Sequence, residues 1–330
     1  MKRKILGVLL GLIIILMVVI TTTKLSSNKN ENLTTIKLAE VTHSAFYAPM
    51  YVAIENGYFK ENGINIDLIL TSGADKVAAA VLSNDVEIGF AGPESAIYVY
   101  KGGEEDYLVT FSGLTKRDGQ FIVSRKPIEN FTLENLYGKE ILTGRTGGMP
   151  ILNFINALDN EKINKDKINM NTSVEFAALS GSFIAGIGDF VNLFEPNASK
   201  LEKEGLGYIV GNIGAYSGEV PYTAFYARKR YIENNKENIT NFTKAIKQGL
   251  EYVKTHTSEE IAKVILPQFP DISLKDLTTI VDNYKKYDSW LENPFITEES
   301  YKNLEDIMIG ADLLDSYVPY DKLINNFYNE

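Results

Sequence analysis

The stretch "GFAGPESAIYVYKGGE", residues 89–104, joins a strand-like run to a helix-like run through glycine, proline and an acid. Apolar residues up to Ala91 predict a buried strand, and Pro93 suits the first turn of the helix that follows. Glu94 and Ser95 then stand at the helix start, where side chains and free backbone N–H groups often face a ligand. The stretch therefore predicts a strand–turn–helix unit whose turn is a candidate binding site.

Similar units recur on both sides of this stretch. Strands are expected at 35–41, 64–70, 86–91, 106–112, 119–125, 139–145, 189–194 and 207–213. Helices are expected between them at 48–59, 73–84, 93–101 and 150–158, and from Lys229 the pattern is almost wholly helical. This alternation predicts an α/β fold of doubly wound lobes, with mostly parallel sheets covered by helices on both faces and a helical tail.

Composition excludes several classes of protein. The chain has 330 residues, 45% of them hydrophobic, which is enough for two well-buried lobes. Its formal net charge of −10 opposes binding to nucleic acid. With no cysteine and only two histidines, thiolate and histidine-rich metal sites are excluded, and no cofactor or metal is expected.

The N-terminus carries the pattern of a membrane-targeting segment. "MKRK" precedes sixteen apolar or glycine residues, Ile5–Ile20, and a polar stretch follows. This order predicts a signal or membrane anchor over 1–24, a flexible tether over 25–34, and an extracytoplasmic location for the rest. Both cleavage of the segment and its retention as an anchor fit its length, and there is no cysteine to carry a lipid.

Five motifs occur in the order of a known family. They are "FYAPMYVAIENGYFKENGINIDL", "GADKVAAAVLSNDVEIGFAGPES", "LYGKEILTGRTGGMP", "GDFVNLFEPNASKLEKEG" and "GEVPYTAFYARKRYIENN", which cover about residues 36–235. In this series the chain resembles the solute-binding proteins of ABC importers, in the nitrate, sulfonate, taurine and thiamine-precursor family. Relatives from Gram-positive bacteria usually have a lipid-bearing cysteine after the signal, and this chain departs from them there.

The resemblance implies a two-lobed periplasmic-binding-protein fold, type II-like, that closes on a ligand between the lobes. Its two crossings are expected near Gly113–Gln120 and Ser217–Thr223. Lobe one would then comprise residues 35–115 and 221–330, and lobe two residues 116–220. The resemblance also implies a binding protein, not an enzyme, that delivers a small molecule to the permease subunits of an ABC transporter.

The turns after the predicted strands supply the candidate ligand residues, because ligands of open α/β sheets bind beyond the carboxyl ends of strands. Aromatic and polar side chains follow the first strand. Small and acidic residues occupy the first turns of the helices that follow the next two strands. A glycine-rich turn lies at 144–150. An acid with an amide lies in "NLFEP", and a tyrosine in the second crossing. The candidates are His43, Ser44, Phe46, Tyr47, Ser72, Gly92, Glu94, Ser95, Thr146, Gly147, Gly148, Asn192, Glu195 and Tyr222.

Three hypotheses for the ligand follow from these residues. The favoured one is a flat aminopyrimidine, of the thiamine-precursor type, stacked on Tyr47 or Phe46 and paired through its amino group with Glu195. The second is a small oxyanion such as a sulfonate, taurine or nitrate on the helix starts. The third hypothesis is a pyrimidine-synthesising enzyme. It is disfavoured because the related enzymes use a cysteine-rich motif and this chain has no cysteine. Against ligand contact, Ser72, Asp75, Glu94 and Ser95 are all natural first-turn residues of a helix, and Glu195 also suits ordinary helix capping.

Overall fold

The structure is a computed structural model, and it describes residues 33–329. The predicted signal or anchor segment, and all of the predicted tether except its last two residues, lie outside the described residues. Residues Thr35–Glu330 belong to one compact unit. Within residues 33–329, no helix combines the length and the apolar character needed to cross a bilayer.

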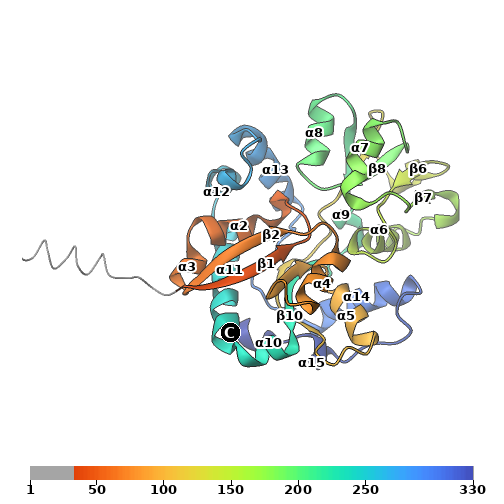
Figure 1. The fold of residues 1–330 in the computed structure, drawn as a ribbon. Coiled ribbons are helices and arrows are strands. Elements are labelled where there is room, and N and C mark those ends of the chain that lie inside the picture. Colours follow the sequence, from red (N-terminus) through yellow and green to blue (C-terminus); the bar gives the residue numbers. More distant parts are fainter. Residues whose placement is uncertain (1–32, 330) are drawn as a thin grey trace, which may run out of the picture. The chain divides into compact units, whose positions relative to one another are not determined.

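The first sheet has five strands in the order β2-β1-β3-β10-β4 (Figure 1). Their bounds are β1 Thr34–Glu40, β2 Ile64–Leu70, β3 Ile88–Ala91, β4 Leu108–Thr115 and β10 Thr223–Arg228. β1 and β3 run parallel, while β10 is antiparallel to both of its neighbours. All but one of its strands therefore precede the second sheet in the sequence.

The second sheet also has five strands, in the order β7-β6-β8-β5-β9. Their bounds are β5 Phe121–Ser124, β6 Glu140–Leu142, β7 Asn169–Asn171, β8 Phe190–Leu193 and β9 Tyr208–Asn212. β6 is parallel to β7 and β8, but β5 is antiparallel to β8 and β9. The expectation of mostly parallel sheets is wrong for β5 and β10, because the chain enters both from the other lobe without a helical crossover to set their direction.

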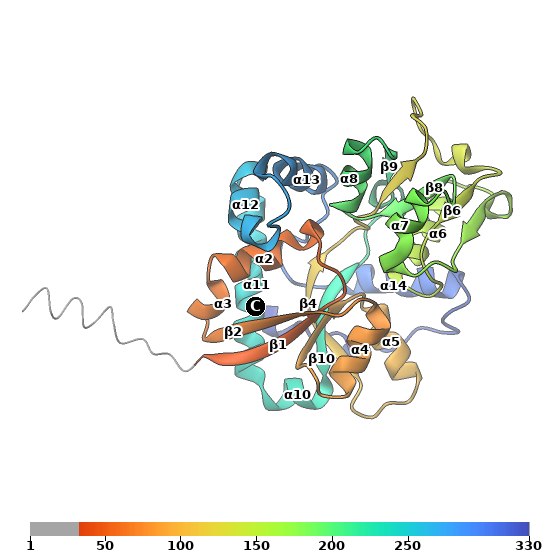
Figure 2. The same cartoon turned by 45° about the horizontal axis from the view of Figure 1, so that its top comes forward.

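Helices cover the two sheets and form the C-terminal tail (Figures 1 and 2). Those before the tail are α2 Ala48–Glu55, α3 Tyr58–Glu61, α4 Ala74–Leu82, α5 Glu94–Lys101, α6 Met149–Asn160, α7 Leu179–Ile184, α8 Asn197–Lys203 and α9 Gly214–Ser217. The tail comprises α10 Lys229–Asn234, α11 Lys236–Thr255, α12 Ser258–Ile265, α13 Leu274–Lys286, α14 Glu298–Gly310 and α15 Tyr320–Leu323. The 3₁₀ turns are η1 Ala45–Tyr47, η2 Leu133–Leu136, η3 Lys165–Lys167, η4 Phe176–Ala178, η5 Leu266–Gln268 and η6 Asn326–Asn329.

The tail packs against both lobes. Helix α11 lies directly on α2, and a Cβ atom at Gly249 would be 2.1 Å from the carbonyl oxygen of Pro49, so only glycine allows this approach. Farther along the tail, α13 lies beside α8 in both views (Figures 1 and 2), where Lys203 donates to Asp276 at 2.7 Å. The tail helices therefore reach across to the second lobe as well as packing on the first.

Two segments carry the chain between the sheets, and they are bonded to each other. Val220 N donates to Lys116 O at 3.0 Å, and Tyr222 N donates to Thr115 O at 3.1 Å. Within the second segment Gly218 has φ 78° and ψ −165°, a backbone region that only glycine visits without strain. This conformation sets the direction in which the chain turns back toward the first sheet.

We expect Gly218→Ala to lower the free energy of unfolding by about 1–3 kcal/mol, the usual cost of holding an L-residue in such a region. No atom lies within 4 Å of the position a Cβ would take, so crowding does not contribute. The matched control is Gly181→Ala inside α7, which also has open space but no positive φ. It should be neutral or slightly stabilising in urea unfolding; equal destabilisation by both changes would contradict this explanation.

Candidate functional site

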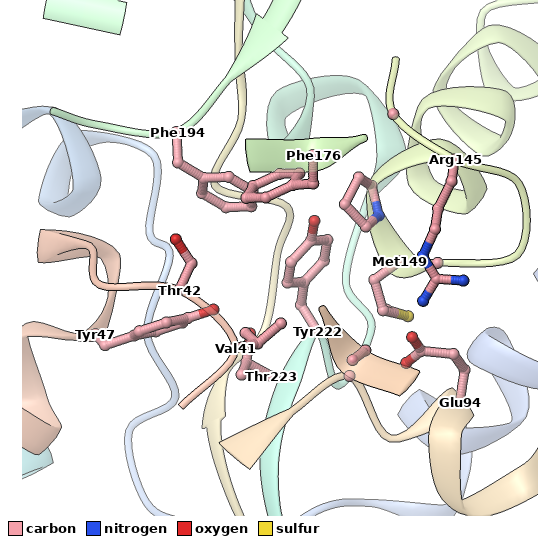
Figure 3. Close-up of a pocket in the computed structure, with 15 residues that line it drawn as sticks. Val41, Thr42, Tyr47, Glu94, Arg145, Met149, Phe176, Phe194, Tyr222 and Thr223 are labelled. Carbon is pink, nitrogen blue, oxygen red and sulfur yellow. The ribbon is translucent and has the colours of Figure 1, made fainter. Parts of the chain in front are cut away.

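A pocket lies where the carboxyl ends of β1, β3, β6 and β8 face one another across the two lobes (Figure 3). Its cavity volume is about 70 Å³. The lining residues are Val41, Thr42, Tyr47, Ala74, Gly92, Glu94, Gly144, Arg145, Gly148, Met149, Pro150, Phe176, Phe194, Tyr222 and Thr223. An engineered cavity that admits benzene has about 150 Å³. The free volume of the pocket is therefore smaller than a ring-sized ligand needs, so such a ligand requires the lobes or the lining side chains to move apart.

Aromatic side chains form one side of the pocket. Figure 3 shows Phe176 and Phe194 above it, Tyr47 at one side with its hydroxyl directed inward, and Tyr222 between them. The ring centroids of Phe176 and Phe194 are 5.7 Å apart, and those of Phe194 and Tyr222 are 6.1 Å apart. Such faces favour a flat apolar or aromatic ligand.

Glu94 is the acid of the pocket. It is 2% exposed, and its Oε2 has no hydrogen-bond partner among the described residues. Burial raises the pKa of this carboxyl to about 7, although backbone N–H groups and the Arg145 guanidinium partly oppose the rise. Because a buried acceptor without a partner is costly, Glu94 is suited to accept a hydrogen bond from a ligand.

Glycine at position 92 makes room for this carboxylate. A Cβ atom there would lie 1.9 Å from Glu94 Oε2 and 2.4 Å from Met149 Cγ. The side chain of Glu94 therefore folds back over the turn that precedes its own helix. Sequence reasoning expected Gly92 to permit close approach; the group that approaches is Glu94 itself.

Contacts between the lobes border the pocket. Arg145, from the loop after β6, pairs with Asp75 of α4 at 2.7 Å. Beside it, the Tyr98 hydroxyl of α5 donates to Gly147 O at 3.0 Å. The two lobes therefore make polar contacts at the rim of the pocket in the described state.

The predicted site residues fall into two groups. Those that line the pocket are Tyr47, Gly92, Glu94, Gly148 and Tyr222. Those that do not are His43, Ser44, Phe46, Ser72, Ser95, Thr146, Gly147, Asn192 and Glu195. The residues of the second group have other environments, described next.

The side chains just after β1 support the local fold. Ser44 caps η1 by accepting from Phe46 N at 3.2 Å, and its hydroxyl donates to Glu195 O at 2.5 Å. Phe46 is fully buried among aromatic rings and lies against Gly119, where a Cβ would be 2.5 Å from the ring. The Phe46 ring is thus used for packing, and Tyr47 is the residue of this stretch that faces the pocket.

Glu195 has its own partners. Its carboxylate accepts from Ser199 N at 2.8 Å and from Ser199 Oγ at 2.6 Å, and Asn283 of α13 lies 3.3 Å away. It therefore caps α8, which is the alternative that the sequence left open. The acid that lines the pocket is Glu94 instead.

Other candidates lie at the surface or beside the pocket. Ser72 and Thr146 are exposed, while Ser95 and Gly147 line a neighbouring groove between α4 and α5. Asn192 is fully buried, and neither polar atom of its amide has a partner among the described residues. These positions therefore make no direct contact with the pocket in this state.

Sequence reasoning missed several pocket residues. Phe176 comes from η4, in a segment without strand or motif signals, so nothing in the sequence indicated it. Arg145 and Phe194 lie inside motifs that were recognised but were not selected. Asp118, which does not line the pocket, is fully buried, and burial raises its pKa well above its usual range.

His43 joins the first lobe to the tail. Its Nδ1 lies 2.7 Å from Glu40 Oε1, and its Nε2 lies 2.9 Å from the carbonyl oxygen of Gln268. The hydrogen bond to Glu40 raises the pKa of His43, although burial opposes the rise. A protonated ring satisfies both partners at once, because it donates from both nitrogens.

We therefore expect a pH-dependent contribution of His43 to stability. Because folding raises its pKa above 6.5, the contribution is complete below pH 6.5 and is lost as pH rises through the folded-state pKa. His43→Gln should cost about 1–2 kcal/mol at pH 5.5 and clearly less at pH 9, measured by urea unfolding. A cost independent of pH would show that the contact does not depend on protonation.

Among residues 33–329, no group of His, Cys, Asp and Glu side chains is arranged to hold a metal ion. Together, the fold and the pocket define a two-lobed α/β protein with a small pocket between its lobes, lined on one side by aromatic rings. This is the arrangement of the periplasmic-binding-protein fold.

The chain belongs to the NMT1/THI5-like family, whose model matches residues 45–260. It is 40% identical over 298 residues to YtlA of Bacillus subtilis, which is named as a binding protein without a stated ligand; the match covers 90% of this chain and 89% of YtlA. These matches confirm the family resemblance that the five motifs indicate.

Solved structures share the fold at low sequence identity. One is the alkanesulfonate-binding protein SsuA from Xanthomonas axonopodis pv. citri bound to MOPS, with a TM-score of 0.71, 13% identity, and coverage of 88% of this chain and 98% of SsuA. Another is the periplasmic nitrate-binding protein NrtA from Synechocystis PCC 6803, with a TM-score of 0.66, 14% identity, and coverage of 90% and 87%. These likenesses support the two-lobed fold.

Proposed function

We propose that the protein is the extracytoplasmic solute-binding component of an ABC importer, and that its ligand is a flat, nitrogen-rich ring of the aminopyrimidine type. The observation that carries the ligand class is the buried Glu94 carboxylate, with an unpartnered oxygen, in an aromatic pocket. A ligand amino group placed there donates the missing hydrogen bond. We therefore assign to Glu94 the acidic role that the sequence gave to Glu195.

The aromatic side chains complete this ligand site. Tyr47 and Phe194 offer ring surfaces to the two sides of a flat ligand, and Tyr222 adds a hydroxyl that lacks a partner among the described residues. The pocket as described is too small for a ring, so the ligand would enter a more open form and shift the population toward closure around it. The closed form is then the one that permease subunits recognise.

The remaining parts of the proposal come from the sequence. We propose lobe boundaries near residues 115 and 221, with 35–115 and 221–330 in lobe one and 116–220 in lobe two. The N-terminal segment would direct the chain across the membrane and tether it or be cleaved. No chemistry on the ligand is proposed, and the pyrimidine-synthesising alternative lacks the cysteine-rich motif that the related enzymes use.

A second candidate ligand is a small oxyanion. Arg145 lines the pocket, and fold neighbours are named for binding alkanesulfonate and nitrate. Against it, a buried Glu94 carboxylate repels a second anion unless it is protonated. The aminopyrimidine is favoured for this reason.

A thermal-shift screen tests the proposal. The protein is heated with the hydroxymethyl aminopyrimidine that forms the pyrimidine half of thiamine, with thiamine, and with methanesulfonate, taurine and nitrate. A ligand that binds the folded state at 100 times its Kd stabilises it by about 2.7 kcal/mol, which raises the melting temperature measurably. A shift with the aminopyrimidine supports the proposal; a shift only with oxyanions supports the second candidate and rejects the first.

A further inference from the structure

Two helices from different lobes begin beside the Glu94 side chain. Helix α5 of the first lobe starts at Glu94, and α6 of the second lobe starts at Met149. The residues that precede them, Pro93 and Gly148, provide no side-chain cap. The backbone N–H groups of Glu94 and Met149, the first residues of the two helices, therefore receive no side-chain cap from the residue before them, whereas Ser95 N donates to Gly92 O at 3.2 Å.

The Glu94 carboxylate lies beside these helix starts. Burial raises its pKa, and the backbone N–H groups of Glu94, Met149 and Ser95 and the positive charge of Arg145 oppose that rise. Figure 3 shows the carboxylate directed toward Met149, with the Arg145 guanidinium beside it. Converging helix starts and a guanidinium are the groups that bind anions in proteins.

We propose that Glu94 fills an anion-binding site formed by the starts of α5 and α6 together with Arg145, and that it thereby excludes small oxyanions from the pocket. The carboxylate is an internal occupant of the place that a sulfonate or nitrate would take. It is held by chain atoms on both lobes, so it also joins the lobes when no ligand is bound.

Packing around the carboxylate supports exclusion. Glu94 is 2% exposed. Met149 also fills the space over Gly92, because a Cβ atom added at Gly92 would lie 2.4 Å from Met149 Cγ. A second anion could not reach the same N–H groups without displacing Glu94. It would also face an ionised carboxylate at close range with little solvent to screen the repulsion.

This inference goes beyond the proposed function, because it concerns which ligands the pocket rejects. If the chain binds no aminopyrimidine, the exclusion of oxyanions still stands. If the site accepts oxyanions, the exclusion fails, whatever the aminopyrimidine does. The two proposals can therefore fail separately.

The experiment compares wild type with Glu94→Ala in calorimetric titrations of the full-length chain with methanesulfonate. The titrations are made at constant ionic strength and at pH 8. This pH keeps Glu94 ionised in the wild type, since burial raises its pKa to about 7. Alanine frees the N–H groups and the space, so we expect the variant to bind methanesulfonate at least about tenfold more tightly, the effect of one restored charge-assisted hydrogen bond. Glu94→Ser serves the same purpose if the alanine variant does not fold.

Asp75→Ala is the matched control. Asp75 also pairs with Arg145, so its removal subtracts the same charge at the rim but leaves Glu94 in place. We expect no gain of methanesulfonate binding from this change. Three results would each overturn the inference. They are submillimolar binding of methanesulfonate by the wild type, an equal gain of methanesulfonate affinity in Asp75→Ala, and no gain of affinity in a folded Glu94 variant.

Discussion

Glu94→Gln is expected to weaken binding of the hydroxymethyl aminopyrimidine by about 10- to 100-fold. The change keeps the size of the side chain but removes the charge, and a hydrogen bond to a charged group is worth about 1.5–3 kcal/mol. Since Glu94 Oε2 lacks a partner among the described residues, the ligand amino group is the donor it would gain. Calorimetric titration at pH 8 measures the affinity, and thermal unfolding checks that the variant is folded.

Glu195→Gln separates this prediction from the one based on the sequence. The Glu195 carboxylate already accepts two hydrogen bonds from Ser199 and does not line the pocket. Its replacement should therefore lower stability with little effect on affinity. If Glu195→Gln loses affinity and Glu94→Gln retains it, the sequence identified the correct acid and the pocket has been misassigned.

Gly92→Ala is expected to lower the free energy of unfolding by about 1–3 kcal/mol and to weaken aminopyrimidine binding as much as loss of the Glu94 charge does. The added methyl group would lie 1.9 Å from Glu94 Oε2 and 2.4 Å from Met149 Cγ, so the carboxylate must leave its place. Overpacking of this kind in a buried site has that typical cost. Urea unfolding and calorimetric titration measure the two effects.

Gly148→Ala is the control for stability. Gly148 lines the same pocket, but a Cβ there would meet only Pro150 at 3.6 Å, an ordinary contact, and its φ is −93°. We expect its unfolding free energy to stay within about 0.5 kcal/mol of wild type. A folded Gly92→Ala protein with unchanged stability and affinity would show that the turn adapts without moving Glu94.

Much of the fold followed from the sequence because the apolar runs are short, regular and separated by clear turn residues. The predicted strand at 64–70 coincides with β2, and the helix predicted over 48–59 is interrupted at Gly57, whose φ is 78°. Strand direction was less predictable. β5 and β10 run antiparallel to their neighbours because the chain crosses between lobes before each, and local periodicity carries no information about such crossings.

The candidate residues chosen from the sequence overlap only in part with the residues that line the pocket. Strand ends and helix starts indicated the turns of Tyr47, Glu94 and Gly148, and these residues line the pocket. The choice between two acids, however, depends on which finds partners nearby: Ser199 satisfies Glu195, whereas Glu94 folds over Gly92 into the pocket. Phe176 enters from a turn distant in the sequence, and only the tertiary arrangement brings it there.

The most direct test is a crystal structure of the protein grown with the hydroxymethyl aminopyrimidine. The account predicts the ring between Tyr47 and Phe194, with its amino nitrogen about 3 Å from Glu94 Oε2. A ring bound outside this pocket, or an oxyanion seated on the starts of α5 and α6 with the Glu94 carboxylate still in place, would contradict it.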